Sequence, residues 1–256
     1  MIGCIIQARM GSSRLPKKVL MNIDENSSVL SSVINQLKFS KKIEKILVAT
    51  TLNQEDDKIV EVSKKLDIES FRGDEKNVLD RYYQCAKKFS INTIVRITAD
   101  CPLIDPIILD NVLEIFLSGH YDYVSNTITR TFPDGTDVEV FSFSALEKSW
   151  QDAKLPSEKE HVTPFMKNNP ALFNLKNVKN NHDLSDLRWT VDEKDDLILI
   201  KKIIQKIPKK PILMDDILRL FSDEPELIEI NKHIIPNEGM IKSLNDDKEF
   251  LKSHEN

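Results

Sequence analysis

The N-terminal part of the chain alternates between short runs of apolar and β-branched residues and longer segments with apolar residues at helical spacing. The apolar runs occupy residues 2–7, 45–51 and 93–98, and the helical patterns occupy residues 28–38, 56–65 and 76–89. Buried strands joined by helices are typical of βαβ units, in which consecutive strands run parallel. We therefore expect an α/β fold, Rossmann-like, with a mostly parallel sheet flanked by helices.

The rest of the chain predicts additions to one main domain. The length of 256 residues with 40% hydrophobic content suffices for a single large core. The strict alternation fades from residue 121, and Pro208 and Pro211 later interrupt a helical pattern. We expect a main domain over residues 1–212, including a small β-containing segment at about 121–180, in which residues 132–140 form a turn and a strand that covers the site. An extension of short helices with a frayed end would follow over residues 213–256.

Composition excludes several classes of protein. The 36 basic and 41 acidic residues leave a mildly acidic chain, which argues against a nucleic-acid or anionic-membrane partner. Cys4, Cys85 and Cys101 are scattered without metal-ligand spacing, and the N-terminus lacks a signal-peptide pattern. No apolar stretch approaches the roughly 20 residues that span a bilayer. We expect a cytoplasmic protein that does not insert into membranes.

A basic loop follows the first predicted strand, at the edge of a parallel sheet where ligands gather. Gly11 permits close backbone approach, and the neighbouring serines and cations offer donors and positive charge to phosphate groups. The loop matches neither Walker A nor GxGxxG, and a solvated basic loop is the alternative. The residues that we expect to bind a nucleotide here are Gln7, Ala8, Arg9, Gly11, Ser12, Ser13, Arg14 and Lys18.

Two aspartates are candidate ligands for a hard cation. Asp100 ends the third predicted strand just after Thr98 and precedes Cys101 and a proline, so it is either a ligand or an ordinary turn former. Asp192 directly precedes a helical pattern, and taken alone it is typical of a helix cap. Magnesium needs only one or two carboxylates when substrate phosphates supply other oxygens.

Polar residues in the second half of the chain suit a hydroxyl-rich ligand. The candidates for binding such an acceptor are Asp134, Asp137, Glu139, Glu160 and His161. A lone histidine after an acidic helical start is more often a surface or capping residue than a catalytic one. No third group completes a nucleophilic triad, so a covalent enzyme intermediate is disfavoured.

Residues 6–18, with the sequence IQARMGSSRLPKK, closely resemble the opening motif of the cytidylyltransferase superfamily that includes the CMP-KDO (3-deoxy-manno-octulosonate) and CMP-sialate synthetases. The resemblance is closest to the spore-coat-polysaccharide branch. Further matches follow in a consistent order at residues 71–73, 78–82, 96–105, 134–139 and 188–192. The resemblance implies a GT-A-like nucleotide-binding fold, a divalent metal and usually a homodimer, for which residues 121–180 are the candidate segment.

The resemblance also implies an activity and roles for residues. The reaction would transfer CMP from CTP to a KDO-, amino-KDO- or nonulosonate-like acid for surface-polysaccharide biosynthesis, releasing pyrophosphate. Asp100 and Asp192 become ligands of Mg²⁺ and, with Arg9 and Lys18, the catalytic residues. In the sialate branch an arginine after the third strand contacts cytosine, and Arg72 corresponds to it in chain order. Further nucleotide-binding candidates are Asp80, Arg81 and Thr98, although Asp80 and Arg81 would equally suit a surface ion pair.

Other functions stay open at this point. A GT-A-type glycosyltransferase would bind a finished sugar nucleotide, but it normally presents a DxD-type acidic pair, which Asp100-Cys101-Pro102 lacks. The acceptor could instead be a non-sugar phosphate or phosphonate, and the nucleotide a different triphosphate. A non-catalytic nucleotide-sensing protein would need neither an intact metal motif nor an intact phosphate motif.

Overall fold

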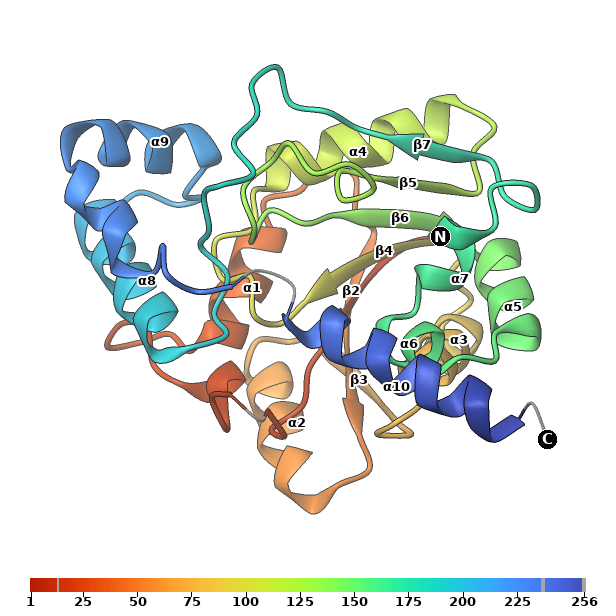
Figure 1. Ribbon diagram of the computed structural model, residues 1–256. Helices are drawn as coiled ribbons and strands as arrows, with labels where there is room; N and C mark the ends of the chain where they lie inside the picture. Colours follow the sequence, from red (N-terminus) through yellow and green to blue (C-terminus); the bar gives the residue numbers. More distant parts are fainter. Residues whose placement is uncertain (13, 236–237, 255–256) are drawn as a thin grey trace.

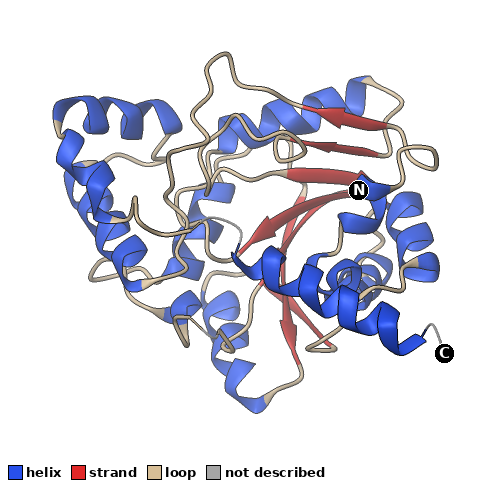
Figure 2. Cartoon of the chain, in the orientation of Figure 1, coloured by secondary structure: helices blue, strands red, loops and turns tan. Residues whose placement is uncertain are grey.

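The computed structural model describes residues 1–256 apart from 13, 236–237 and 255–256, so the predicted phosphate-binding Ser13 lies outside the described residues. Its described strands form one mixed, mostly parallel sheet with helices on both faces, as Figures 1 and 2 show. The strand order is β3-β2-β1-β4-β6-β5-β7. The predicted α/β fold is confirmed.

The three predicted strands form the centre of the sheet with the predicted bounds. They are β1 (Ile2–Gln7), β2 (Lys45–Thr51) and β4 (Thr93–Thr98). Their apolar side chains are almost all buried because helices cover both faces. Gln7 is paired in register with both Ala49 and Thr98, so the three parallel strands end at the same edge. The edge strand β3 (Glu69–Gly73) is only partly buried, and it lacks the apolar run that would have predicted it.

Helices cover the two faces in separate groups. The helices α1 (Val29–Leu37), α2 (Asp57–Lys65) and α4 (Pro106–Ser118) pack on one face. The helices α3 (Val78–Lys88) and α5 (Phe143–Asp152) pack on the other. Three of these helices match the predicted patterns because their apolar residues recur at helical spacing toward the sheet.

The β-containing segment at about residues 121–180 continues the main sheet. Its strands are β5 (Tyr123–Ser125), β6 (Glu139–Ser142) and β7 (Leu175–Asn177), and β6 pairs antiparallel with β4. The strands thus do not cover the site as expected. The short helices α6 (Pro156–His161) and α7 (Pro164–Asn168) come from the same segment, and α6 reaches the edge of the sheet where the parallel strands end.

The C-terminal extension has two parts. A third apolar cluster packs α8 (Lys194–Lys206) against α9 (Met214–Asp223) and the 3-10 helix η3 (Pro225–Ile230). The chain then returns across the molecule as α10 (Glu238–His254), the longest described helix with 17 residues, and α10 lies against α6 (Figure 1). The expectation of only short helices is wrong for α10. This helix buries polar residues such as Ser243 and Asp247, so it has no apolar stripe toward the protein that would have predicted it.

Candidate active site

A cavity of about 440 Å³ lies where β1 and β4 end. The loop after β1, the end of β4, helix α6 and helix α10 form its walls. A cavity of similar volume, about 450 Å³, lies beside α1, but the described residues that line it include no carboxylate. The cavity at the strand ends therefore best combines the predicted functional groups.

The loop after β1 is anchored from below by a buried carboxylate. Asp56 is 1% exposed and accepts hydrogen bonds from the Met10 backbone N–H (2.8 Å) and from Thr51 at the end of β2. The Lys17 N–H donates to the Met10 carbonyl (3.0 Å) and closes the loop, with Lys17 in the left-handed region at a φ of 64°. The short 3-10 helix η1 (Lys18–Leu20) then starts, so that Lys18 faces the cavity.

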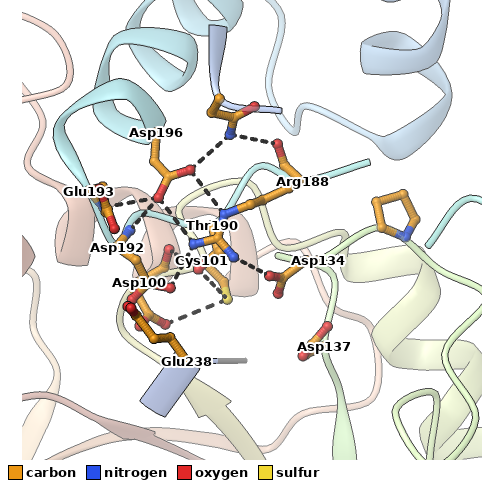
Figure 3. Close-up of polar contacts among 12 residues, drawn as sticks. Asp100, Cys101, Asp134, Asp137, Arg188, Thr190, Asp192, Glu193, Asp196 and Glu238 are labelled. Carbon is orange, nitrogen blue, oxygen red and sulfur yellow. Dashed lines mark hydrogen bonds and ion pairs between the residues drawn. The ribbon is translucent and has the colours of Figure 1, made fainter. Parts of the chain in front are cut away.

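Lys18 joins two carboxylates that are far apart in the sequence. Its Nζ donates to Asp100 Oδ2 (2.7 Å) and to Asp192 Oδ1 (2.8 Å), and Arg14 also contacts Asp192 Oδ1 at 2.8 Å. The Val191 N–H donates to the Asp100 carbonyl at 2.8 Å and ties the two segments together. Figure 3 shows the two aspartates side by side. The fold thus brings together the residues that the sequence marked as metal ligands.

The charges in this cluster shift one another's pKa values. Burial opposes the charge on Lys18, but the carboxylates of Asp100 and Asp192 outweigh it and raise the Lys18 pKa. Burial likewise works against the Asp192 carboxylate, yet Lys18, Arg188 and Arg14 together lower its pKa to about 2. Asp192 therefore stays ionised at neutral pH, as a cation ligand must.

Arg188 is a positioning residue to which the sequence analysis assigned no role. Its side chain is 9% exposed and contacts Asp192 Oδ2 (2.7 Å), Asp134 Oδ2 (2.5 Å) and Asp196 Oδ1 (3.0 Å), as Figure 3 shows. Asp196 accepts the N–H groups of Asp192 and Glu193 at 2.8 and 2.9 Å. Glu193 is thus the N-cap residue of α8, Asp196 accepts a hydrogen bond from its N–H from within the first turn, and the Asp192 carboxylate is left to the cations.

A buried glutamate orients a second arginine, Arg96. Arg96 lines the cavity from β4 and forms an ion pair with Glu139, which is only 4% exposed. The Glu139 carboxylate also accepts from Tyr123 (2.5 Å), Thr163 (2.7 Å) and Lys167 (2.9 Å). Burial alone would raise the pKa of Glu139, but Lys167 and Arg96 lower it. Glu139 therefore lies beneath the cavity and fixes Arg96, and it does not line the acceptor space as predicted.

Most of the predicted site residues lie together. The described predicted residues that line the cavity are Gln7, Ala8, Arg9, Gly11, Ser12, Arg14, Lys18, Thr98, Asp100, Glu160, His161 and Asp192. Arg9 contacts Glu160 across the cavity at 3.7 Å. The predicted phosphate-binding loop, the paired aspartates and the α6 residues thus share one space.

The three residues predicted near the base do not line this cavity. Arg72 donates to the carbonyls of Thr51 and Asn53, both at 2.8 Å, and pairs with Asp57. Arg81 is 2% exposed and donates to the Asp74 carbonyl at 2.9 Å. Asp80 accepts from the Trp150 indole at 2.8 Å. The chain-order match expected Arg72 after the third strand, but Arg72 lies within β3, and its guanidinium donates to backbone carbonyls at and just after the end of β2.

Asp134 and Asp137 face Arg130 and Arg188 and do not line the cavity. Arg130 donates to both oxygens of Asp137, at 2.6 Å each. Burial and the neighbouring Asp137 raise the pKa of Asp134 to about 6, against the opposing effects of Arg130 and Arg188. Asp134 lines a separate cavity of about 340 Å³ that it shares with Arg188. Asp134 supports the Asp192 segment through Arg188, and both Asp134 and Asp137 lie outside the predicted acceptor space.

Comparison with known proteins establishes the family. A sequence profile described as cytidylyltransferase matches residues 3–230. The chain belongs to the cytidylyltransferase family. The predicted family is therefore confirmed.

Individual relatives agree with this assignment. The spore coat polysaccharide biosynthesis protein SpsF of Bacillus subtilis is 33% identical over 230 residues, which cover 87% of this chain and 94% of that protein. The 3-deoxy-manno-octulosonate cytidylyltransferase of Trichlorobacter lovleyi is 27% identical over 173 residues, covering 60% and 67%. A solved cytidylyltransferase from Leptospira borgpetersenii serovar Hardjo-bovis superposes with a TM-score of 0.87 at 36% identity, covering 91% of this chain and 98% of that one.

Two parts of this cytidylyltransferase's cavity were not predicted. Arg96 had an available signal, because strand alternation places it on the same face of β4 as Thr98. Helix α10 had none. It supplies Gly239, Lys242, Ser243 and Asp246. Among the described residues, no helix is long and apolar enough to cross a membrane.

Proposed function

We propose that this cytidylyltransferase transfers CMP from CTP to an acidic sugar of the KDO, amino-KDO or nonulosonate type and releases pyrophosphate, for surface-polysaccharide biosynthesis. The observation that carries the proposal is the meeting of the loop after β1 with two aspartates, bridged by Lys18, in one cavity. The oxygen of an acceptor hydroxyl attacks the α-phosphorus and gives up its proton to water. The bond from this phosphorus to the leaving oxygen breaks, and pyrophosphate departs with that electron pair.

The paired aspartates fit a hard divalent cation. The Lys18 ammonium contacts both carboxylates at 2.7 and 2.8 Å, so one positive group already bridges them. Among the described residues no group of three or more Asp, Glu, His or Cys side chains is placed to hold a metal. Two carboxylates plus substrate oxygens and water are the usual environment of Mg²⁺ beside phosphates. Asp100 and Asp192 would hold this ion, which when bound supplies positive charge to the reacting phosphate.

The loop cations bind and orient the triphosphate. Each of these cations contacts a carboxylate of the protein. Arg9 contacts Glu160, and Arg14 contacts Asp192 and Glu238. Lys18 contacts Asp100 and Asp192. These acidic partners keep the cations ordered before substrate arrives, and phosphate oxygens compete for the same donors. Preordered cations lower the cost of positioning the triphosphate for in-line attack.

Two relatives support an acidic sugar as the acceptor. One is named for spore coat polysaccharide biosynthesis and the other for cytidylyl transfer to 3-deoxy-manno-octulosonate. The family match favours a free nucleoside triphosphate over the finished sugar nucleotide that a glycosyltransferase would bind. The three loop cations that line the cavity fit the same choice, since a triphosphate carries more negative charge than a sugar nucleotide.

The test is pyrophosphate release from CTP, UTP, ATP and GTP, each with a panel of acceptors, with and without Mg²⁺. The panel contains KDO, its 8-amino analogue, N-acetylneuraminate, glucose 1-phosphate and 2-aminoethylphosphonate. We expect release that depends on CTP, on a sugar acid and on Mg²⁺. Release with only the phosphate or the phosphonate, or with a purine nucleotide, would replace the proposed substrates. Breakdown of a sugar nucleotide without pyrophosphate release would instead support a glycosyltransferase.

A further inference from the structure

The C-terminal helix α10 lies outside the part of the chain that matches the family. The match ends at residue 230, and α10 spans Glu238–His254. Nevertheless, α10 supplies Gly239, Lys242, Ser243 and Asp246 to the wall of the active-site cavity. Figure 1 shows this helix passing beside α6 at the ends of the parallel strands. A segment beyond the family match thus completes the cavity.

Polar contacts hold α10 in this place. The Ser243 hydroxyl donates to Glu160 Oε2 (2.9 Å) and lies 2.9 Å from His161 Nε2. The Ser157 N–H at the start of α6 donates to Asp247 Oδ1 at 2.9 Å. Ser243 and Asp247 are 2% and 6% exposed, whereas the apolar Ile241 and Leu244 point to solvent at 52% and 47%. The face of α10 toward the protein therefore suits a polar ligand site and not an apolar core.

Lys242 differs from the other cations of the cavity. The remaining arginines and lysines in its lining, which are Arg9, Arg14, Lys18 and Arg96, each contact a carboxylate within 4 Å. Among the described residues, Lys242 is the lining cation for which no carboxylate lies that close, although Asp246 is one turn away on the same helix. A cation without an acidic partner can bind an anionic ligand without first giving up a carboxylate of the protein.

The position of Lys242 separates it from the triphosphate end of the cavity. Glu238, at the start of α10, contacts Arg14 at 3.5 Å and lies near the Asp100 and Asp192 pair in Figure 3. Lys242 follows one helical turn later, about 6 Å further along the axis. Its neighbour Ser243 contacts Glu160 and His161 of α6. The Lys242 part of the cavity wall therefore lies one turn beyond the Glu238 contact with Arg14 and faces α6.

We propose that α10 forms the acceptor-facing wall of the active site and that Lys242 binds the carboxylate of the acidic sugar. Ser243 and Asp246 lie beside it in the cavity lining and suit the sugar hydroxyls. This inference rests on the proposed cytidylyl transfer to an acidic sugar. It adds a specificity residue from a helix that the family match does not include.

The experiment compares Lys242→Met with Lys248→Met, which removes the same charge from an exposed position of α10 that lines no described cavity. Pyrophosphate release is measured with CTP and either KDO or N-acetylneuraminate. For Lys242→Met we expect the KM for the acid to rise about tenfold or more, because one charge-assisted hydrogen bond to the acid is lost. The KM for CTP should stay within about twofold of the wild-type value. Lys248→Met should match the wild type, and Lys242→Arg should recover most of the affinity for the acid.

The outcomes separate the two proposals. An unchanged KM for the acid in Lys242→Met overturns the role of Lys242 while the cytidylyltransferase activity stands. An equal rise in both KM values would instead place Lys242 at the triphosphate and overturn the acceptor wall. A wild-type enzyme that releases no pyrophosphate with any sugar acid refutes the proposed substrate class itself, and the inference fails with it.

Discussion

Replacing Asp192 by asparagine tests whether the paired carboxylates carry the reaction. The substitution keeps the shape of the side chain but removes its charge and one acceptor oxygen. In the structure, one Asp192 oxygen receives Lys18 and Arg14 and the other receives Arg188. If this carboxylate helps to hold the metal ion, we expect turnover to fall on the order of 10²–10³-fold, the size of effect seen when one electrostatic contact to the reacting group is lost.

The effect of Asp192→Asn on stability should be small by comparison. Breaking a fully buried ion pair costs about 3–5 kcal/mol when a charge is left alone. Here Lys18 keeps Asp100, and Arg188 keeps Asp134 and Asp196, while Arg14 is partly exposed. We therefore expect a loss of only about 1–2 kcal/mol in the free energy of unfolding. Removing a competitor for Lys18 should also leave CTP binding without metal at least as tight as in the wild type.

The assay combines turnover at saturating CTP and sugar acid, a Mg²⁺ titration, CTP affinity without metal, and thermal unfolding. Asp195→Asn is the matched control, because it removes the same charge in the first turn of α8. In the described part of the chain, the one ion-pair partner of the Asp195 carboxylate is His233, at 3.4 Å. The double variant with Asp100→Asn should lose little more activity than either single variant, since the two residues act as a unit. Turnover within about threefold of the wild type in Asp192→Asn would refute the two-carboxylate site.

Three further predictions concern the residues around the site. Arg188→Met should lower the free energy of unfolding by about 3–5 kcal/mol, since it removes the cation that pairs with the fully buried Asp196. Denaturant unfolding measures this loss, and a loss below about 1 kcal/mol would contradict the prediction. Arg72→Ala should leave the ratio of kcat/KM for CTP and UTP unchanged because its guanidinium is bound to backbone carbonyls, and a tenfold change in that ratio would restore Arg72 as a base-reading residue. The raised pKa of Asp134, about 6 against an unfolded value of 3.8, contributes stability that is fully present below pH 3.8 and is lost as the pH rises through 6. Asp134→Asn should remove this pH dependence of the free energy of unfolding between pH 3.8 and 6. If that free energy changes with pH equally in the variant and the wild type, the contribution of Asp134 is excluded.

The central strands and their helices could be predicted because each depends on a local pattern. An apolar run such as residues 45–51 is buried on both faces wherever it enters a covered sheet, so its neighbours in space need not be known. The loop after β1 was recognisable for the same reason, since its glycine, serines and cations follow one strand directly. Parallel strands then place such a loop and Asp100 at one edge without further information.

The contacts between distant segments were decided only by the tertiary structure. Nothing near Arg72 or Glu139 in the sequence indicates that one would bind backbone carbonyls or that the other would lie under Arg96. A carboxylate or guanidinium can satisfy its hydrogen bonds in many ways, and the partners that surround it choose among them.

The same reasoning explains Asp192 and α10. A sequence with Asp before a helix is compatible with a cap, but here Glu193 is the N-cap residue, and Arg188 and Lys18 bind the Asp192 carboxylate. Helix α10 packs through polar side chains, so periodic hydrophobicity could not indicate which face meets the protein. Local patterns thus determined the sheet and the polar loop that follows its first strand. The partners of each buried charge depended on long-range packing, because a charge is stabilised by whatever opposite charges the fold brings to it.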